Sequence, residues 1–270
     1  MKNKFNTPIV VSEHWTGYHK ENNLYQGFLK KKFTEYVVRK TSTIHVVAQQ
    51  LQYSMEAVGL KGNYTSIGNV VNTHLFQPAK KSIKDNCCRI IYVGNLIQHH
   101  KRILDLIQLI GQLTEQRTDF ELDIYGEGAA EAECRGLIEQ NQWKNRIHLK
   151  GTLDRPGIAK EMSTAHFLVL YSETENQPCV INEAQACGLP VVVPDIEGIV
   201  ERMNKKLGIV FSKSKPQEFS DAVNIMIDQH HQYNREYIRS FAEQEYSELN
   251  IAKKFEALYL HAITKAQHQT

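Results

Sequence analysis

The sequence has 270 residues, of which 41% are hydrophobic and 23% charged, as expected for an ordinary globular protein with a sizeable core. Lys and Arg number 32 against 30 Asp and Glu, and this balance argues against a nucleic-acid partner. Five cysteines without paired spacing favour a reducing compartment over a disulfide framework. Residues 1–6 lack the apolar core of a signal peptide, so we expect a cytoplasmic protein.

The first 80 residues contain few predicted elements. Strands are predicted at residues 8–14 and 43–47, with a basic amphipathic helix at 25–39 between them. Residues 66–78 are rich in turn formers, and residues 79–86 read as a polar linker. Two or three strands make a poor open sheet. We therefore interpret residues 1–80 as the remnant of a second α/β domain.

Strands and helices alternate regularly from about residue 86 onward. The predicted strands are nearly all apolar and lie at 89–93, 121–125, 146–149, 166–171, 190–193 and 208–211. The predicted helices lie between them at 101–116, 129–140, 156–164, 180–187 and 217–230. This alternation predicts a doubly wound α/β domain with a parallel sheet over residues 81–250. A last amphipathic helix, with Phe255, Leu258 and Ile263 on one side, is expected within 251–270 and to pack back toward the N-terminal segment.

The polar chemistry concentrates in residues 172–195 (SETENQPCVINEAQACGLPVVVPD). A buried strand is predicted to end at Ser172, and a helix to begin near Pro178. Ligands of open parallel sheets bind at the carboxyl ends of strands, beside helix N-termini that favour phosphate. Glu175 and Glu183 flank this helix start and can accept hydrogen bonds from sugar hydroxyls, which suggests a nucleotide-sugar. Two glutamates at this spacing also occur by chance, so the spacing alone does not distinguish a functional site from a chance pair.

This segment resembles the signature of glycosyltransferase family 4, the retaining enzymes of GT-B fold. The family pattern is S-x-x-E-(G)-(F)-P/G, four residues, then E-A-x-A-x-G-x-P-V. The matching positions are Ser172, Glu175, Pro178, Glu183, Ala184, Ala186, Gly188, Pro190 and Val191. Asn176 and Gln177 replace the usual Gly-Phe, and Gly198 with Glu201 meets a G-x-x-E pattern downstream.

Further matches extend the resemblance from about residue 8 to about residue 265. Lys101, which follows Gly94-Asn95-Leu96, stands where the family places its diphosphate lysine. Asn95 replaces an arginine there, and Arg102 is a candidate to compensate for it. Other family positions are matched by the glycines Gly126, Gly128 and Gly151, by the interdomain linker 67–78 with Gly68 for Pro and Asn72 for Asp, and by His14 near the donor sugar.

The resemblance implies transfer of a sugar from a nucleoside diphosphate sugar to an acceptor hydroxyl with retention of configuration. Lys101 and the helix start at Cys179 and Val180 would neutralise the diphosphate, Glu183 would hold the ribose and Glu175 the sugar. The implied catalytic residues are Glu175, Lys101 and His14. The implied donor-binding residues are Asn95, Lys101, Arg102, Gly126, Gly151, Asn176, Gln177, Cys179, Val180 and Glu183.

The implied partners are a nucleotide-sugar and an acceptor glycan or lipid-linked glycan, in cell-surface polysaccharide or glycoconjugate synthesis. The chain has no Asp-x-Asp motif, so we expect neither a metal nor another cofactor. A non-catalytic nucleotide- or sugar-binding module, left by loss of the acceptor domain, remains the alternative. With so few N-terminal strands, we also expect exposed apolar surface and weak transfer.

Other features give weaker signals. His99-His100 and His230-His231 are adjacent pairs without zinc spacing, and Gly126-x-Gly128 lacks the third glycine of a dinucleotide site. The cysteines Cys87, Cys88, Cys179 and Cys187 are interpreted as small buried hydrophobes. Residues 29–33 (LKKKF) are typical of a solvated helix face. The alternative is that they contact the inner face of an anionic membrane.

Overall fold

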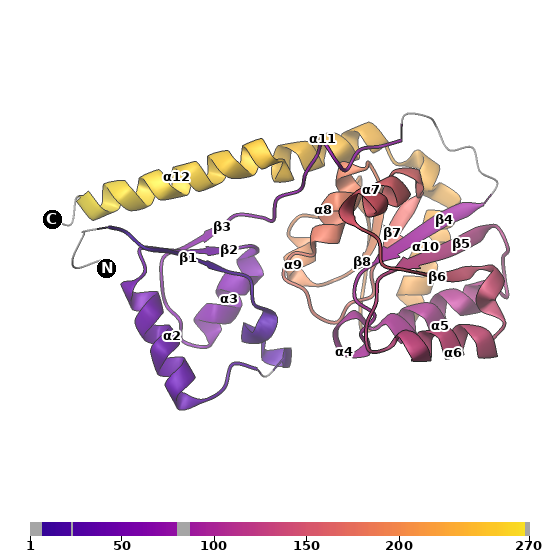
Figure 1. Ribbon diagram of the computed structural model, residues 1–270, viewed down its shortest axis with the longest axis horizontal. Helices are drawn as coiled ribbons and strands as arrows, with labels where there is room; N and C mark the ends of the chain where they lie inside the picture. Colours follow the sequence, from indigo (N-terminus) through magenta and orange to yellow (C-terminus); the bar gives the residue numbers. More distant parts are fainter. Residues whose placement is uncertain (1–6, 23, 80–86, 268–270) are drawn as a thin grey trace.

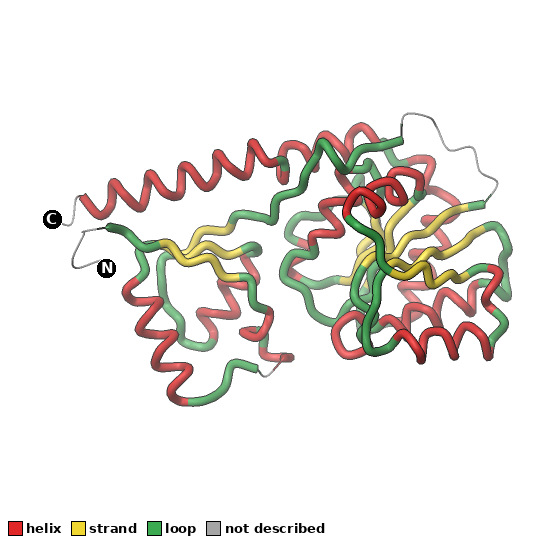
Figure 2. The backbone as a smooth tube through the Cα atoms, viewed as in Figure 1, coloured by secondary structure: helices red, strands yellow, loops and turns green. Residues whose placement is uncertain are grey.

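The computed structural model describes residues 7–22, 24–79 and 87–267 as two α/β parts (Figure 1). Residues 1–6, which the sequence analysis compared with a signal peptide, lie outside the described residues. The predicted linker at 79–86 also lies outside them, apart from Ala79. Each part has its own parallel sheet, visible as two groups of strands in Figure 2. The expected α/β class with parallel sheets is confirmed.

The larger sheet has six parallel strands in the order β6-β5-β4-β7-β8-β9. Their bounds are β4 Cys88–Val93, β5 Phe120–Tyr125, β6 Ile147–Gly151, β7 Phe167–Val169, β8 Val191–Pro194 and β9 Gly208–Phe211. The chain runs outward from β4 to β6, crosses back to β7 and then runs outward in the opposite direction. The order therefore reverses between β4 and β7, which makes this pair the topological switch point of the sheet.

Helices cover both faces of this sheet (Figure 1). On one face, α5 packs against both α6 and α10, and on the other α8 packs against α11. The helices of this part are α4 Gln98–Lys101, α5 Ile103–Leu113, α6 Glu131–Gln140, α7 Arg155–Thr164, α8 Cys179–Ala186, α9 Glu197–Val200, α10 Pro216–Gln229 and α11 Arg235–Tyr246, with 3-10 turns η3 Trp143–Asn145 and η4 His230–Gln232.

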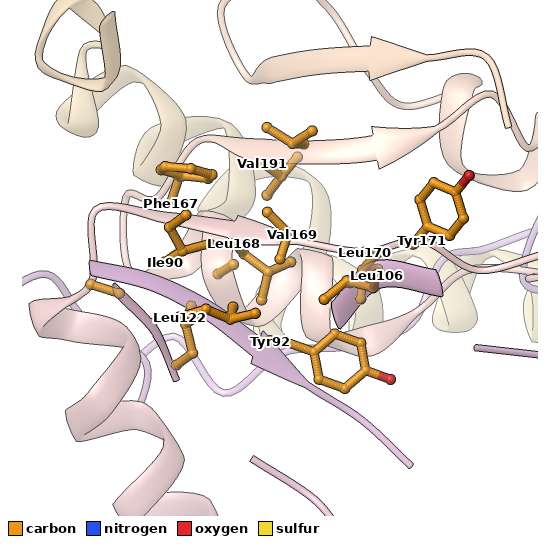
Figure 3. Close-up of a cluster of buried hydrophobic side chains, with 14 of the residues drawn as sticks. Ile90, Tyr92, Leu106, Leu122, Phe167, Leu168, Val169, Leu170, Tyr171 and Val191 are labelled. Atoms are coloured by element: carbon orange, nitrogen blue, oxygen red, sulfur yellow. The ribbon is translucent and has the colours of Figure 1, made fainter. Parts of the chain in front are cut away.

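Burial on both faces explains why the strands are nearly all apolar. Ile90, Ile91 and Tyr92 are consecutive on β4, and all three are buried. Figure 3 shows the core around Ile90 and Tyr92, where side chains from the central strands meet Leu106 of α5. This core holds the strand ends in fixed positions, and the loops that leave those ends carry the candidate site.

The N-terminal part is a three-stranded parallel sheet in the order β1-β2-β3. Its elements are β1 Val10–Glu13, η1 Thr16–Tyr18, η2 Lys20–Asn22, α2 Phe28–Lys40, β2 Thr43–Val46, α3 Gln49–Ala57 and β3 Tyr64–Ser66. Ile44 and Val46 of β2 point into one small core with Val38 of α2 and Leu51 of α3. Helices α2 and α3 lie on this face of the sheet (Figure 1).

The opposite face of the small sheet is covered by the last helix, α12, at Glu248–Gln267. Ile251 and Leu258 of α12 pack with Ile67, which follows β3, and Phe255 joins them. A backbone bond from Val71 N to Tyr246 O, 2.9 Å long, fixes the junction from which α12 starts. The chain thus returns from the large sheet to the small one at its C-terminal end.

Four details differ from the sequence predictions. Helices α3 and α11 and strand β3 were not predicted. The apolar patterns of α3 and β3 are short or mixed, whereas α11 has a periodic apolar face, with Ile238, Ala242 and Tyr246 buried, that the prediction did not use. Ile263 was expected on the packed side of the last helix but is 44% exposed. It follows Leu258 by five residues, which turns it away by more than a third of a helical turn, and Ala262 occupies the packed side instead.

Candidate functional site

The candidate site lies where the loops after β4 and β7 meet, at the switch point. Short helix α4 follows β4, and the loop at residues 172–178 follows β7. Glu173 N donates to His100 O over 2.8 Å, so the two loops are bonded directly to each other. The predicted residues Lys101 and Glu175 are therefore brought together from two different strands.

Lys101 and Glu175 form an ion pair between the Nζ and Oε1 atoms. The Lys101 side chain is largely buried, and Glu175 is buried with 9% of its surface exposed. Burial and the Glu175 charge raise the pKa of Tyr92 beneath the loop, so that phenol stays protonated. Burial, His99 and Lys101 lower the pKa of His100, which favours the neutral form of that imidazole.

The Arg102 side chain has partners of its own, separate from the Lys101–Glu175 ion pair. Its Nε donates to Asp105 Oδ2 over 2.8 Å, and its guanidinium lies 4.7 Å from the ring centre of Tyr171. The backbone of Arg102 is left-handed, with φ of 49°, where α4 ends and α5 begins. This conformation is uncommon outside glycine and turns the chain sharply after Lys101. Asn95 lies on the preceding loop and is exposed.

Gly126 and Gly151 bring two further loops close to the first. Gly126 has φ of 144°, and a Cβ there would lie 1.9 Å from Gly94 O, so only glycine fits. Gly126 N donates to Gly151 O over 2.9 Å. The ends of β4, β5 and β6 therefore meet in one tightly packed row of backbone beside Asn95.

Helix α8 places Glu183 in the same region but with a different partner. Cys179 and Val180 form its first turn, and Glu183 lies one turn further along. Glu183 Oε1 accepts from Arg155 Nη2 over 3.0 Å, with side chains 16% and 64% exposed respectively. Burial raises the pKa of Glu183, and the Arg155 charge opposes this effect only in part. The carboxylate is thus desolvated and held by one surface cation.

Asn176 and Gln177 attach the loop after β7 to the N-terminal part and to the linker. Asn176 Nδ2 donates to His14 O over 2.7 Å, and Asn176 Oδ1 contacts His19 Nε2 at 2.5 Å. Gln177 Oε1 accepts from Asn69 N over 2.5 Å, and Asn69 Nδ2 donates to Gln177 O over 2.8 Å. His14 is therefore beside the loop through its backbone, with an exposed side chain.

Several weaker predictions are also placed. Cys179 was expected to be buried but is exposed, because it occupies the first turn of α8, outside the packed core. Phe33 and Leu29 of the LKKKF segment are exposed, Leu29 by 82%. Within the described ranges, no three His, Cys, Asp or Glu side chains gather in a way that a metal ion would require. Among the described residues, none of the helices is long and apolar enough to cross a lipid bilayer.

Sequence reasoning missed four residues that contact the candidate site. They are His19 and Asn69, which hold the loop after β7, Arg155, which holds Glu183, and Lys213, which holds Glu173. Asn69 falls in the linker pattern and could have been found there. The others lie far from the loop in sequence, and nothing in their local pattern indicates the contact.

Comparisons with known proteins agree with this arrangement. The family described as Glycosyl transferases group 1 matches residues 87–229, just over half of the chain. The gpi3 subunit of phosphatidylinositol N-acetylglucosaminyltransferase from Schizosaccharomyces pombe is 23% identical over 195 residues, covering 72% of this chain and 42% of the relative. The chain spans less than half the length of the curated relatives it matches.

Solved structures share the fold over almost the whole chain. Sucrose-phosphate synthase from Thermosynechococcus elongatus has a TM-score of 0.82 at 18% identity, covering 98% of this chain and 70% of that one. S. aureus TarM, solved as a mutant with fondaparinux, α-GlcNAc-glycerol and UDP, has a TM-score of 0.80 at 19% identity, covering 95% of this chain and 52% of that one. These likenesses show the same GT-B arrangement of two α/β parts.

Proposed function

Because this chain belongs to the glycosyl transferases group 1 family, we propose that it transfers a sugar from a nucleoside diphosphate sugar to an acceptor hydroxyl with retention of configuration. The observation that carries the proposal is the partly buried Lys101–Glu175 pair at the switch point, beside the start of α8. We assign residues 81–250 to donor binding, residues 1–80 to the acceptor side, and residues 251–270 to a closing helix.

The diphosphate is the part of the donor that needs positive charge. As the sugar leaves, negative charge grows on the diphosphate, and fixed cations or helix N-termini stabilise it. Lys101 is the cation of α4, and the first turn of α8 begins at Cys179 nearby in the fold. In the free chain Lys101 neutralises Glu175 instead, so donor binding exchanges one anionic partner of Lys101 for another.

The two glutamates are proposed to hold the two sugars of the donor. Glu183 is desolvated on α8 and would accept hydrogen bonds from ribose hydroxyls. Glu175, released from Lys101, would accept a hydrogen bond from a hydroxyl of the transferred sugar. His14, with its exposed side chain, lies beside the same loop on the side of the N-terminal part, where we place the acceptor. Asn95 and the backbone at Gly126 and Gly151 would line the donor.

A binding screen tests this function directly. Thermal unfolding of the chain is measured with UDP, ADP and GDP and with their glucose and N-acetylglucosamine derivatives, since a ligand of the native state raises the midpoint. We expect one nucleotide series to raise it and the matching nucleosides to do so much less. A chain that binds none of them does not have the proposed function. Binding without turnover, in transfer assays with several acceptors, would favour the non-catalytic module.

We also propose that the reaction needs no metal ion. The support is the availability of Lys101 and a helix N-terminus for the diphosphate charge, together with a sequence free of Asp-x-Asp. EDTA should leave donor binding and turnover unchanged. Loss of either on chelation, restored by Mn²⁺ or Mg²⁺, would contradict this part of the proposal.

The exposed face of α2 supports peripheral contact with an anionic membrane that carries the acceptor. Leu29, Phe33 and Tyr36 follow one another at helical spacing, and all three are exposed. Residues 30–32 are three consecutive lysines on the same helix, which suits anionic headgroups. Sedimentation with phosphatidylglycerol vesicles should exceed that with phosphatidylcholine vesicles, and Leu29→Ser with Phe33→Ser should abolish it. Equal sedimentation with both lipids would refute the contact.

A further inference from the structure

We propose that His19 is a positioning residue that sets the donor loop through Asn176, so that the N-terminal part controls how Glu175 meets the transferred sugar. The proposal rests on the proposed function and concerns the same site. His19 itself is not placed in contact with substrate.

His19 is held in place by its own loop. Glu13, at the end of β1, accepts from the backbone N–H groups of His14 and Trp15 over 2.8 Å each. Tyr18 OH donates to the same carboxylate over 3.2 Å. His19 N donates to Thr16 O over 3.1 Å. The imidazole therefore projects from an ordered turn and is buried.

The hydrogen bonds of His19 show which of its ring nitrogens donates to Asn176. Asn176 Nδ2 donates to His14 O, so Asn176 Oδ1 is the acceptor that faces His19 Nε2. His19 Nε2 must therefore carry a hydrogen. His19 Nδ1 lies 2.8 Å from Ser54 Oγ on α3, whose hydroxyl can donate to it. The His19 imidazole thus links α3, the turn after β1 and the loop after β7.

Asn176 cannot relax away from this contact easily. Gly198 of α9 lies behind it, and a Cβ at Gly198 would come within 1.9 Å of Asn176 O. Asn176 is thus confined between α9 and His19, and Glu175 is its direct neighbour in sequence. Loss of the His19 contact should therefore loosen Glu175 while leaving the nucleotide side of the site, on α8, unchanged.

Hydrogen exchange of the free chain tests the contact without any ligand. His19→Ala should raise amide exchange in the peptide covering residues 172–178 about tenfold, the effect of losing one buried hydrogen bond. His19→Gln keeps an N–H donor and should exchange like the wild type. His261→Ala, on the exposed side of α12, is the matched control. Unchanged exchange in the folded His19→Ala chain would overturn the proposal.

Calorimetry with UDP-N-acetylglucosamine and UDP tests the consequence. His19→Ala should weaken binding of the sugar nucleotide about three- to tenfold and leave UDP within about twofold, with His19→Gln restoring the difference. Equal losses for both ligands would show a merely structural role and refute the assignment. If the wild-type chain binds neither ligand, the assumed nucleotide is wrong, and the exchange experiment still decides the role of His19.

Discussion

Replacing Glu183 with alanine tests the donor site at the carboxylate proposed to hold the ribose. The side chain is 16% exposed, and Arg155 is its ion-pair partner among the described residues. If Glu183 accepts the ribose hydroxyls, Glu183→Ala leaves those hydroxyls with one partner fewer in a partly buried site. That loss is typically about 1–3 kcal/mol, or about 5- to 150-fold in Kd.

The ion pair between Arg155 and Glu183 also affects the measured affinity for UDP. In the free chain Arg155 occupies the carboxylate that the ribose would use, over 3.0 Å. Since Arg155 is 64% exposed, solvent screens the pair, and its contribution is at most about 1 kcal/mol. Arg155→Ala should therefore change the affinity for UDP by less than about fivefold, in the direction of tighter binding.

The assay is titration calorimetry with UDP and with 2′,3′-dideoxy-UDP, which lacks both ribose hydroxyls. Glu183→Ala should weaken UDP binding and leave the dideoxy ligand unchanged, because the second ligand has nothing for the carboxylate to accept. Equal losses for both ligands, with the far-UV spectrum intact, would refute the ribose role and show that Glu183 acts through the packing of α8.

Three further outcomes are expected. Lys101→Ala should weaken UDP binding by about tenfold or more in calorimetry and uridine binding hardly at all, because the ammonium is proposed to meet the diphosphate. Glu183→Gln should raise the thermal midpoint at pH 7.5. Burial raises the pKa of Glu183 in the native state, so the protonated side chain contributes its full stability below the ordinary pKa of 4.5. That stability is lost as the pH rises through the native pKa and the side chain ionises. That gain should vanish at pH 4. Gly198→Ala should lower the free energy of unfolding in urea by about 1–3 kcal/mol, since its Cβ would lie 1.9 Å from Asn176 O and one of them must move by more than 1 Å.

The fold of the larger part could be predicted because its signals are local. Strands buried on both faces are continuous apolar runs, and the predicted run at residues 190–193 lies within one residue of the fully buried β8 at Val191–Pro194. Helix α5 shows one clear apolar face, which its buried residues Ile103, Leu106 and Ile110 confirm. In α3 the apolar positions are few, and its packing against β2 and η1 decides its structure instead.

The residues of the candidate site also fall into those that could be predicted from the sequence and those that could not. Lys101 was predicted from the family resemblance, and Glu175 from its loop after β7 and the same resemblance. The parallel sheet brings the segments after β4 and β7 together at the switch point. Arg155 and His19 were missed because each reaches the site from another element, and Arg155 does so with a long, exposed side chain. Phosphate binding by Arg102 stays a prediction from its position in sequence, and its guanidinium contacts Asp105 and Tyr171.

The replacement of the family's Gly-Phe by Asn176-Gln177 has a physical explanation in these contacts. A glycine at position 176 has no side chain to bond His14 O and His19, and a phenylalanine at 177 has no acceptor for Asn69 N. Both amides are buried, so each needs its partners, and unpaired they would destabilise the loop. The departure therefore requires the N-terminal part and the linker to be present and correctly placed. A change in how the two α/β parts sit would reach Glu175 through its neighbour Asn176, and it would reach α8 through Asn182, whose Nδ2 donates to Asn69 O over 3.0 Å.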